Sequence, residues 1–316
     1  MREDASMPLR LTRLCLWLAV CAALVALAVP GSAGVAMAQP VPGCDPRASL
    51  RPLGPPPPPG QMPAGSTMAR ILARGNLVAG VDQNTYRFGF LDPFNPATGR
   101  LEGFDIDVVR WIAEAIFGDP NRVQYRIVIN VGEGLETAER GDVDLVVRTT
   151  TITCERRERV EFSTVYFEAG QRVLVLRGSG ATGIGDLDGR TVCATTGSTS
   201  LMRVQQAYPQ VRTMPALSAT DCLARLQLGE VDAVSSDDAI LAGLAAQDPR
   251  TEVVGAPFSE EPYGVVVNQN TPDLVRFVNA VLEQRRADGS WEASYRPWLE
   301  DLLGPVPPIP VAAYRD

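Results

Sequence analysis

The chain of 316 residues contains no histidine and no lysine, since all 29 of its basic residues are arginine. Without histidine there is no Ser-His-Asp or Cys-His nucleophile, and the commonest metal ligand and neutral-pH base are missing. Without lysine there is no P-loop lysine, no Schiff base and no lysine base. Any enzyme chemistry would therefore depend on carboxylates, tyrosine, cysteine, arginine or a bound cofactor.

A basic surface is also missing, because 37 acidic residues give the chain a net charge of −8. Proteins that bind nucleic acids normally carry a basic footprint, so we expect no nucleic-acid partner. A hydrophobic content of 45% is ordinary for a globular protein. The length allows one or two domains with cores of their own.

The N-terminus has the layout of a secretory signal peptide. Arg10 and Arg13 precede an uncharged stretch over residues 14–38, which ends in a small-x-small pattern at Ala38. We expect residues 1–38 to be a signal peptide cleaved near Ala38. The alternatives are an uncleaved membrane anchor and a lipoprotein modified on Cys44, although Pro42 and the late position of this cysteine weigh against lipidation. All three place the remaining chain outside the cytoplasm, in the periplasm or at the cell surface.

Four of the six cysteines lie beyond the signal segment. An even count in an exported chain indicates two disulfides, with three connectivities. We favour Cys193–Cys222 and Cys44–Cys154, because the first two fall in one candidate domain. Closing the loop between Cys193 and Cys222 stabilises a fold by about 3–4 kcal/mol in the chain-entropy model. A zinc site is the alternative, and the absence of histidine and of a CxxC pair disfavours it.

Two proline-rich segments flank the middle of the chain. Residues 39–67 contain the run PLGPPPPPG and predict a stiff, extended linker. The folded part should begin near Met68. The tail over residues 304–316 is again rich in proline and should be irregular.

Between these segments the pattern alternates short apolar runs with amphipathic stretches. Residues 76–148 predict a β-α-β-α-β unit, and residues 189–255 predict a second, similar series. A strand over residues 263–268 then returns to the first unit, and two helices over residues 274–299 complete it. The prediction is an α/β fold of two lobes joined by two crossing strands. Such sheets bind ligands at the carboxyl ends of their strands.

The predicted boundaries define the names used below. Lobe 1 comprises residues 68–177 and 263–303, and lobe 2 comprises residues 178–262.

Five segments, in this order, resemble the extracytoplasmic solute-binding proteins of polar amino-acid ABC transporters (family 3, glutamine/glutamate-binding type). The most specific is GDVDLVVRTTTITCERRERVEFSTVYF at residues 141–167. The others lie at residues 77–90, 101–118, 184–200 and 229–241. The resemblance implies a two-lobed periplasmic-binding-protein fold, with parallel-rich sheets, helices on both faces and two crossing hinge strands.

The resemblance also implies which lobe 1 residues bind the α-carboxylate of an amino acid. Arg156 matches the arginine whose planar fork can bond both carboxylate oxygens. Taken alone, this arginine would be a surface residue in the charged run 155–159. Thr149 and Thr151 match the positions that offer backbone and hydroxyl groups beside it. Taken alone, they would be ordinary threonines at the end of a strand.

Lobe 2 supplies the other side of this arrangement. Ser198 and Thr199 lie between a strand and a helix, where backbone N–H groups would bond the same carboxylate. Asp237 matches the acidic residue that holds the α-ammonium, and its local alternative is a helix N-cap. Cys154 stands where the family usually has Asp, which suits a disulfide to the N-terminal arm.

The side chain of the ligand is harder to assign. Asp82 and Tyr86 match the region that packs on it. Arg148 ends a strand where it could reach into the cleft and pair with a side-chain carboxylate, and Arg87 and Arg172 are alternative cations. We therefore expect glutamate or aspartate first, and glutamine or asparagine next.

The expected function is capture of a polar L-amino acid by hinge closure and delivery to an ABC permease. We expect a monomer that is not an enzyme and that uses no cofactor and no metal. One alternative is a ligand-sensing subunit for a membrane kinase. The other is a cyclohexadienyl-type dehydratase on the same fold, which would need a placed general acid in the cleft.

Overall fold

The computed structural model describes residues 43–92 and 99–315. The predicted signal peptide, residues 1–38, lies outside the described residues. By their contacts, residues 39–316 form one compact unit. Within the two described ranges, no helix has the length and apolar character needed to cross a membrane.

The first sheet has five strands in the order β6-β2-β7-β15-β8. β2 (Leu77–Val81) pairs in parallel with β6 (Val123–Ile127) and β7 (Leu145–Val147). β15 (Val266–Val267) pairs in the antiparallel sense with both β7 and β8 (Glu161–Phe162). Successive side chains of β7 point to opposite faces, so Leu145 and Val147 join one buried cluster and Val146 joins another. Both faces of this sheet are therefore covered.

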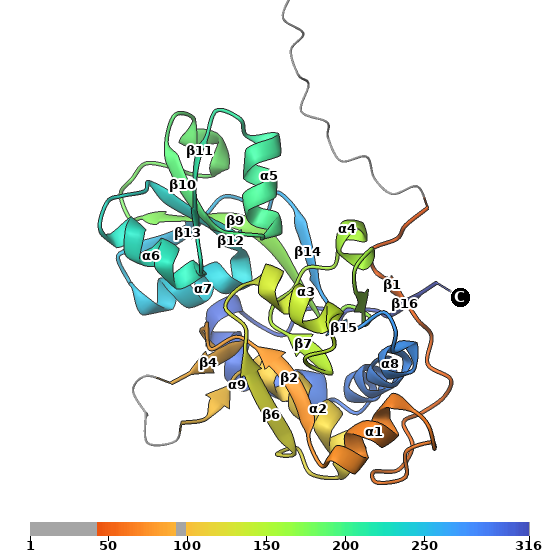
Figure 1. Cartoon of the computed structure of the whole chain (residues 1–316). Coiled ribbons are helices and arrows are strands. Elements are labelled where there is room, and N and C mark those ends of the chain that lie inside the picture. Colours follow the sequence, from red (N-terminus) through yellow and green to blue (C-terminus); the bar gives the residue numbers. More distant parts are fainter. Residues whose placement is uncertain (1–42, 93–98, 316) are drawn as a thin grey trace, which may run out of the picture. The chain divides into compact units, whose positions relative to one another are not determined.

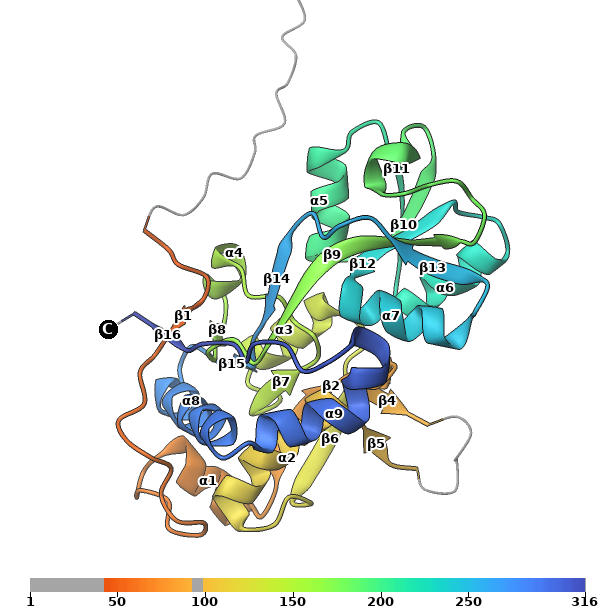
Figure 2. The same ribbon diagram turned by 180° about the vertical axis from the view of Figure 1, so that it is seen from behind.

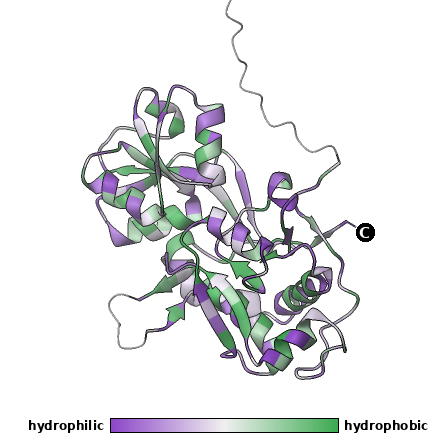
Figure 3. Cartoon of the chain, viewed as in Figure 1, coloured by the Kyte–Doolittle hydropathy of each residue, from purple (hydrophilic) through white to green (hydrophobic). Residues whose placement is uncertain are grey.

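Helices supply that cover. The helices around the first sheet are α1 (Thr67–Arg74), α2 (Phe104–Phe117), α3 (Val131–Glu139), α8 (Pro272–Ala287) and α9 (Ser290–Leu303). Leu135 of α3 packs in the cluster that contains Val146, whereas Ile112 of α2 packs with Leu145 and Val147. Figure 3 shows the same distribution, with apolar colouring concentrated in the strands that these helices cover.

The second sheet has the order β11-β10-β12-β9-β13, and β14 also pairs with β9. Its strands are β9 (Phe167–Leu176), β10 (Thr191–Thr195), β11 (Arg212–Ala216), β12 (Ala233–Asp237), β13 (Thr251–Val254) and β14 (Glu260–Tyr263). Its helices are α5 (Thr199–Ala207), α6 (Ala219–Gln227), α7 (Asp238–Gln247) and the 3-10 turn η1 (Ile184–Leu187). Ser218 starts α6 with a capping box to Asp221, which satisfies free N–H groups of the first turn.

Two strands connect the sheets. β9 begins with Phe167 in the aromatic core around the first sheet and continues with Val173 and Val175 into a buried cluster of the second sheet. β14 pairs with β9 in the antiparallel sense and leads back to β15. Figure 1 shows β9 and β14 running together between the two sheets. The fold is therefore the expected two-lobed α/β fold with two crossing strands, and the residue boundaries of the lobes stay a prediction.

Several short elements were not expected from the sequence. They are β3 (Asn84–Thr85), β4 (Gly89–Leu91) and β5 (Leu101–Glu102), which form a small sheet, and α4 (Cys154–Arg157). Elements of two to four residues are too short to show a helical or strand period. α4 nevertheless places Arg156.

Both disulfides have the connectivity that the sequence favours. Cys44 is bonded to Cys154 and Cys193 to Cys222. The first joins the N-terminal arm to α4, and the second joins β10 to α6 within lobe 2.

The proline-rich segment is not a free spacer over its described part, and this corrects the sequence expectation. Ala48–Ser49 (β1) pairs in parallel with Ala313–Tyr314 (β16) of the C-terminal tail. Leu50 and Met62 pack against the core of lobe 1. The prolines between them lack N–H groups that would need partners, so the segment can follow the surface without a sheet of its own.

Candidate functional site

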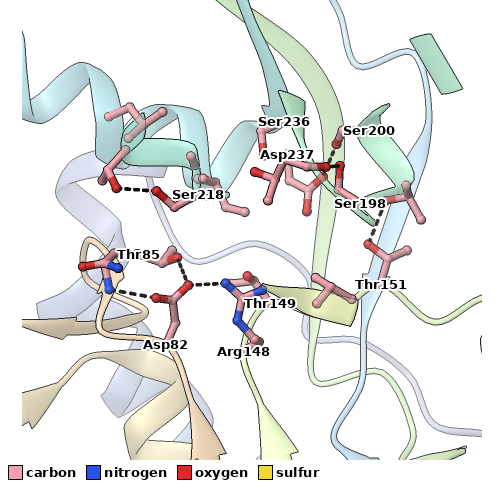
Figure 4. A pocket seen from close by; sticks show the side chains of 18 of the residues that line it. Asp82, Thr85, Arg148, Thr149, Thr151, Ser198, Ser200, Ser218, Ser236 and Asp237 are labelled. Atoms are coloured by element: carbon pink, nitrogen blue, oxygen red, sulfur yellow. Dashed lines mark hydrogen bonds and ion pairs between the residues drawn. The ribbon is translucent and has the colours of Figure 1, made fainter. Parts of the chain in front are cut away.

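A pocket lies between the lobes, with a cavity volume of about 50 Å³. Figure 4 shows side chains of both lobes facing each other across it, with Asp82, Arg148 and Thr151 on one side and Ser198, Ser218 and Asp237 on the other. The lining residues are Asp82, Asn84, Thr85, Tyr86, Val131, Arg148, Thr149, Thr151, Arg156, Thr195, Ser198, Thr199, Ser200, Ser218, Ala219, Thr220, Ser236, Asp237, Ile240 and Leu244.

All nine residues that the sequence nominates for ligand binding line this pocket. Their individual roles stay predictions. The two alternative cations do not line it. Arg87 donates to the carbonyl oxygen of Trp298, and Arg172 donates to that of Val253.

Arg156 is a buried cation that has no carboxylate partner among the residues described by the structure. Its Nη1 donates to Thr151 O at 2.6 Å and its Nη2 donates to Gly197 O at 3.2 Å. The ion pairs among the described residues do not include it. Burial lowers the pKa of Arg156 to about 10, which the charges of Glu261 and Asp237 oppose, so the guanidinium stays protonated at neutral pH. A buried charge of this kind calls for an anionic partner.

Asp237 is the matching buried acid. It ends β12 and precedes α7, but its side chain makes no N-cap hydrogen bond, so the alternative N-cap role is not used. Tyr263 Oη donates to Asp237 Oδ2 at 2.6 Å, and no ion pair of the described residues includes this carboxylate. Burial, and next the charge of Glu261, raise the pKa of Asp237 to about 8.

The lobes touch at this end of the pocket. Thr199 Oγ1, at the start of α5 in lobe 2, lies 3.5 Å from Thr151 Oγ1 of lobe 1. The bond from Arg156 to Gly197 O joins the same lobes. The described arrangement is therefore closed.

Thr149 contributes an unusual backbone. Its φ of +43° lies in the left-handed region, which a β-branched residue seldom adopts. The N–H of Thr149 donates to Asp105 Oδ2 at 2.9 Å, and Asp105 also accepts a bond from Tyr166 Oη at 2.7 Å. Burial raises the pKa of Asp105 to about 7. This buried network holds the strained residue at the pocket wall.

The other end of the pocket contains a closed ion pair. Arg148 Nη2 donates to Asp82 Oδ2 at 2.5 Å, and both side chains are buried. Asp82 also accepts bonds from Thr85 Oγ1 and from the backbone N–H groups of Gln83 and Asn84. The Nε of Arg148 is buried without a hydrogen-bond partner. This end is therefore neutral overall and still has a donor to offer.

Sequence reasoning missed part of lobe 2. Ser218, Ala219 and Thr220 line the pocket where β11 passes into α6. Ser218 Oγ lies 2.9 Å from Thr220 Oγ1. Their position after the carboxyl end of a parallel strand is the signal that could have found them.

Comparison with known proteins places this site in a family. Residues 77–301 match the family model of the bacterial extracellular solute-binding proteins, family 3. The chain belongs to this family.

Individual relatives narrow the comparison. The chain is 36% identical over 236 residues to the ABC transporter glutamine-binding protein of Bacillus subtilis (strain 168), covering 74% of this chain and 85% of that protein. It is 37% identical over 201 residues to the glutamine-binding protein of Geobacillus stearothermophilus, covering 63% and 75%. It is 26% identical over 252 residues to the glutamate/aspartate import solute-binding protein of Salmonella typhimurium, covering 78% and 82%.

A solved structure agrees on the fold. The L-cysteine solute receptor of Neisseria gonorrhoeae has a TM-score of 0.71 at 26% identity, covering 76% of this chain and 96% of that chain.

Proposed function

We propose that this protein binds L-glutamine outside the cytoplasm by closing its two lobes around it, and that it delivers the amino acid to the membrane permease of an ABC transporter. The observation that carries the proposal is that Arg156 and Asp237 are both buried in the pocket and that neither has an ion-pair partner among the described residues. The proposal assigns no chemical step on the ligand.

The proposed ligand is a zwitterion. An α-amino acid carries a carboxylate and an ammonium on one carbon, and both lose hydration in a closed pocket. The guanidinium of Arg156 can take the carboxylate, together with backbone N–H groups where α5 begins at Thr199. Asp237 can take the ammonium. Neither residue has an ion-pair partner among the described residues, so the ligand would complete both.

The side chain of the ligand would meet the pocket end that contains Arg148 and Asp82. A glutamate or aspartate carboxylate would need a cation that is free to pair with it. Arg148 is already paired with Asp82, so a second carboxylate would meet a neutral pair. An amide needs both donors and acceptors, and this pair with Thr85 and Ser218 supplies hydroxyl groups, a carboxylate and the N–H of a guanidinium. This favours glutamine over the glutamate that the sequence alone suggested, and the two glutamine-binding relatives support it.

Ligand binding would also favour closure of the two lobes. A ligand that contacts both lobes stabilises the closed form by its differential affinity for it. The residues that would bridge it are Arg156 and Thr151 on lobe 1, and Thr199 and Asp237 on lobe 2. The crossing strands β9 and β14 are the natural hinge. A permease would then take the ligand from the closed form.

The test is calorimetric titration of the purified protein, first unfolded in denaturant without a reductant and refolded to remove carried-over ligand. L-Glutamine, L-glutamate, L-aspartate, L-asparagine, L-cysteine and L-arginine are compared. We expect tight binding of glutamine, and glutamate weaker by about tenfold or more, since a buried unpaired charge costs at least that much. Tighter binding of glutamate would refute the role given to the pocket end that contains Arg148 and Asp82. Binding of none of these amino acids would refute the proposal.

A further inference from the structure

The N-terminal arm, residues 43–49, reaches the crossing strands through one side chain. Arg47 forms a bidentate ion pair with Glu168 of β9, in which the Nη2–Oε2 distance is 3.1 Å. The same Nη2 donates to Glu260 Oε2 of β14 at 2.9 Å. One guanidinium therefore binds both strands that connect the lobes.

The arm is fixed to lobe 1 on both sides of this arginine. Before it, Cys44 is bonded to Cys154 of α4, and the buried Arg157 donates to Pro46 O at 3.2 Å. After it, Ser49 Oγ donates to Phe162 O at 2.6 Å. Both views of the chain place β1 beside β16 and close to α4 (Figures 1 and 2). The backbone on both sides of Arg47 is therefore fixed, so less conformational entropy is lost when its side chain forms the ion pairs.

The two carboxylates differ in their place along the ribbon formed by β9 and β14. In this ribbon Glu168 lies opposite Pro262, and Glu260 lies opposite Gly170, two positions nearer to lobe 2. Because Glu260 lies nearer to lobe 2, a bend of the ribbon on opening would move Glu260 relative to lobe 1 more than it would move Glu168. The bond from Arg47 to Glu260 is present in the closed arrangement described here.

We propose that Arg47 is a positioning residue of the hinge, which binds Glu260 in the closed form and so slows release of the ligand. The inference rests on the proposed function for its ligand, and it concerns residues that do not line the pocket. Stabilising the closed form lowers the apparent Kd by the same factor as it raises the closed population.

The experiment compares Arg47→Ala, Glu260→Gln and the double variant with the wild-type full-length protein. L-Glutamine is the probe, with release followed by stopped-flow tryptophan fluorescence and affinity by calorimetry. Each single variant should weaken binding about two- to fivefold, the range for ion pairs that are partly exposed to solvent. The loss should lie in the release rate, with the association rate unchanged, and should shrink in 1 M NaCl. The double variant should be no weaker than either single variant.

Arg74→Ala is the matched control, because it removes an arginine that pairs with Asp144 inside lobe 1. It should leave the release rate unchanged. Equal release rates in wild type, Arg47→Ala and Glu260→Gln would overturn the inference, as would additive losses in the double variant.

A ligand-free readout separates this inference from the proposed function. If the wild-type protein does not bind glutamine, the proposed function fails. Hydrogen exchange in the ligand-free protein then decides the role of the arm: Arg47→Ala should speed exchange of the β14 amides, and Arg74→Ala should not. Unchanged exchange in β14 would overturn the inference.

Discussion

The two ends of the pocket contain the same kinds of charged group in opposite arrangements. At one end Arg156 and Asp237 are both buried and form no ion pair among the described residues. At the other end Arg148 and Asp82 are equally buried and are bonded to each other at 2.5 Å. Burial without an ion-pair partner disfavours the charged form of each group, so the first end gains most from a ligand that supplies the opposite charges. At the second end, the two charges already compensate each other within the protein.

This difference separates two tasks. The unpaired end should determine how tightly any α-amino acid binds, because every such ligand has the same carboxylate and ammonium. The paired end should determine which amino acid is preferred, because it meets the side chain. Substitutions at the two ends should therefore have different signatures.

The largest effect should come from the unpaired end. Arg156→Ala or Asp237→Ala should weaken glutamine binding by about 100-fold or more, because each leaves one ligand charge buried without a partner. Calorimetry measures the loss. Arg159→Ala is the control, since this nearby arginine is exposed and pairs with Glu139.

The same Arg156→Ala variant has a second signature in the free protein. Its ligand-free thermal unfolding midpoint should not fall, because the change removes a buried unpaired charge. Near-normal glutamine binding by both Arg156→Ala and Asp237→Ala would show that neither residue belongs to the binding site.

Acidity should weaken binding through the same end. Burial holds the pKa of Asp237 near 8 in the free protein, so the carboxyl is largely protonated below that pH. The ligand ammonium favours the ionised form, and binding must then release a proton. Affinity should fall as the pH drops from 8 to 6, by up to about tenfold per unit. Titrations in buffers of different ionisation enthalpy count the released protons, and Asp237→Asn should abolish the dependence. A wild-type affinity that is flat from pH 6 to 8 would contradict this account.

The paired end should control selectivity by a smaller factor. Asp82→Asn keeps the shape of the side chain but leaves Arg148 without its counter-charge. Preference should shift from glutamine toward glutamate by about tenfold, because the glutamate carboxylate can now pair with the guanidinium. Competition titrations measure the ratio. Thr85→Val removes a hydroxyl bond to Asp82 but leaves the ion pair of Asp82 with Arg148, so it should weaken glutamine binding without shifting the preference toward glutamate. An unchanged ratio in Asp82→Asn would show that the ion pair does not select the ligand.

The sequence was informative where residues act one at a time. Periodicity and strand-end positions predicted the two-lobed fold, and all nine nominated residues line the pocket. The ion pair between Arg148 and Asp82 at the paired end was not predicted, because it depends on how two strands that are distant in the sequence align. β2 and β7 pair with Val81 opposite Val147, which brings the next residues, Asp82 and Arg148, side by side. No local pattern contains that register.

The expectation that the proline-rich segment is a free spacer was wrong for a related reason. Composition describes what a segment can do alone, and residues 52–60 alone would be a stiff spacer. Its flanking contacts decide otherwise: Cys44 is bonded to Cys154, and Asn279 Nδ2 donates to Ser49 Oγ at 2.8 Å. These partners are more than 100 residues away in the chain, so only the folded structure shows them.

The smallest effect should come from hydroxyl groups that face the paired end from lobe 2. Thr220→Val removes the hydroxyl that lies 2.9 Å from Ser218 Oγ and keeps the volume and branching of the side chain. One neutral hydrogen bond contributes about 1 kcal/mol, so glutamine binding should weaken by a few-fold, about fivefold in the central case. The loss should be smaller for an amino acid without a side-chain amide, such as L-alanine, because that ligand does not reach this end. If both ligands lose affinity equally, Thr220 acts through closure of the lobes, and the division between an affinity end and a selectivity end does not extend to lobe 2.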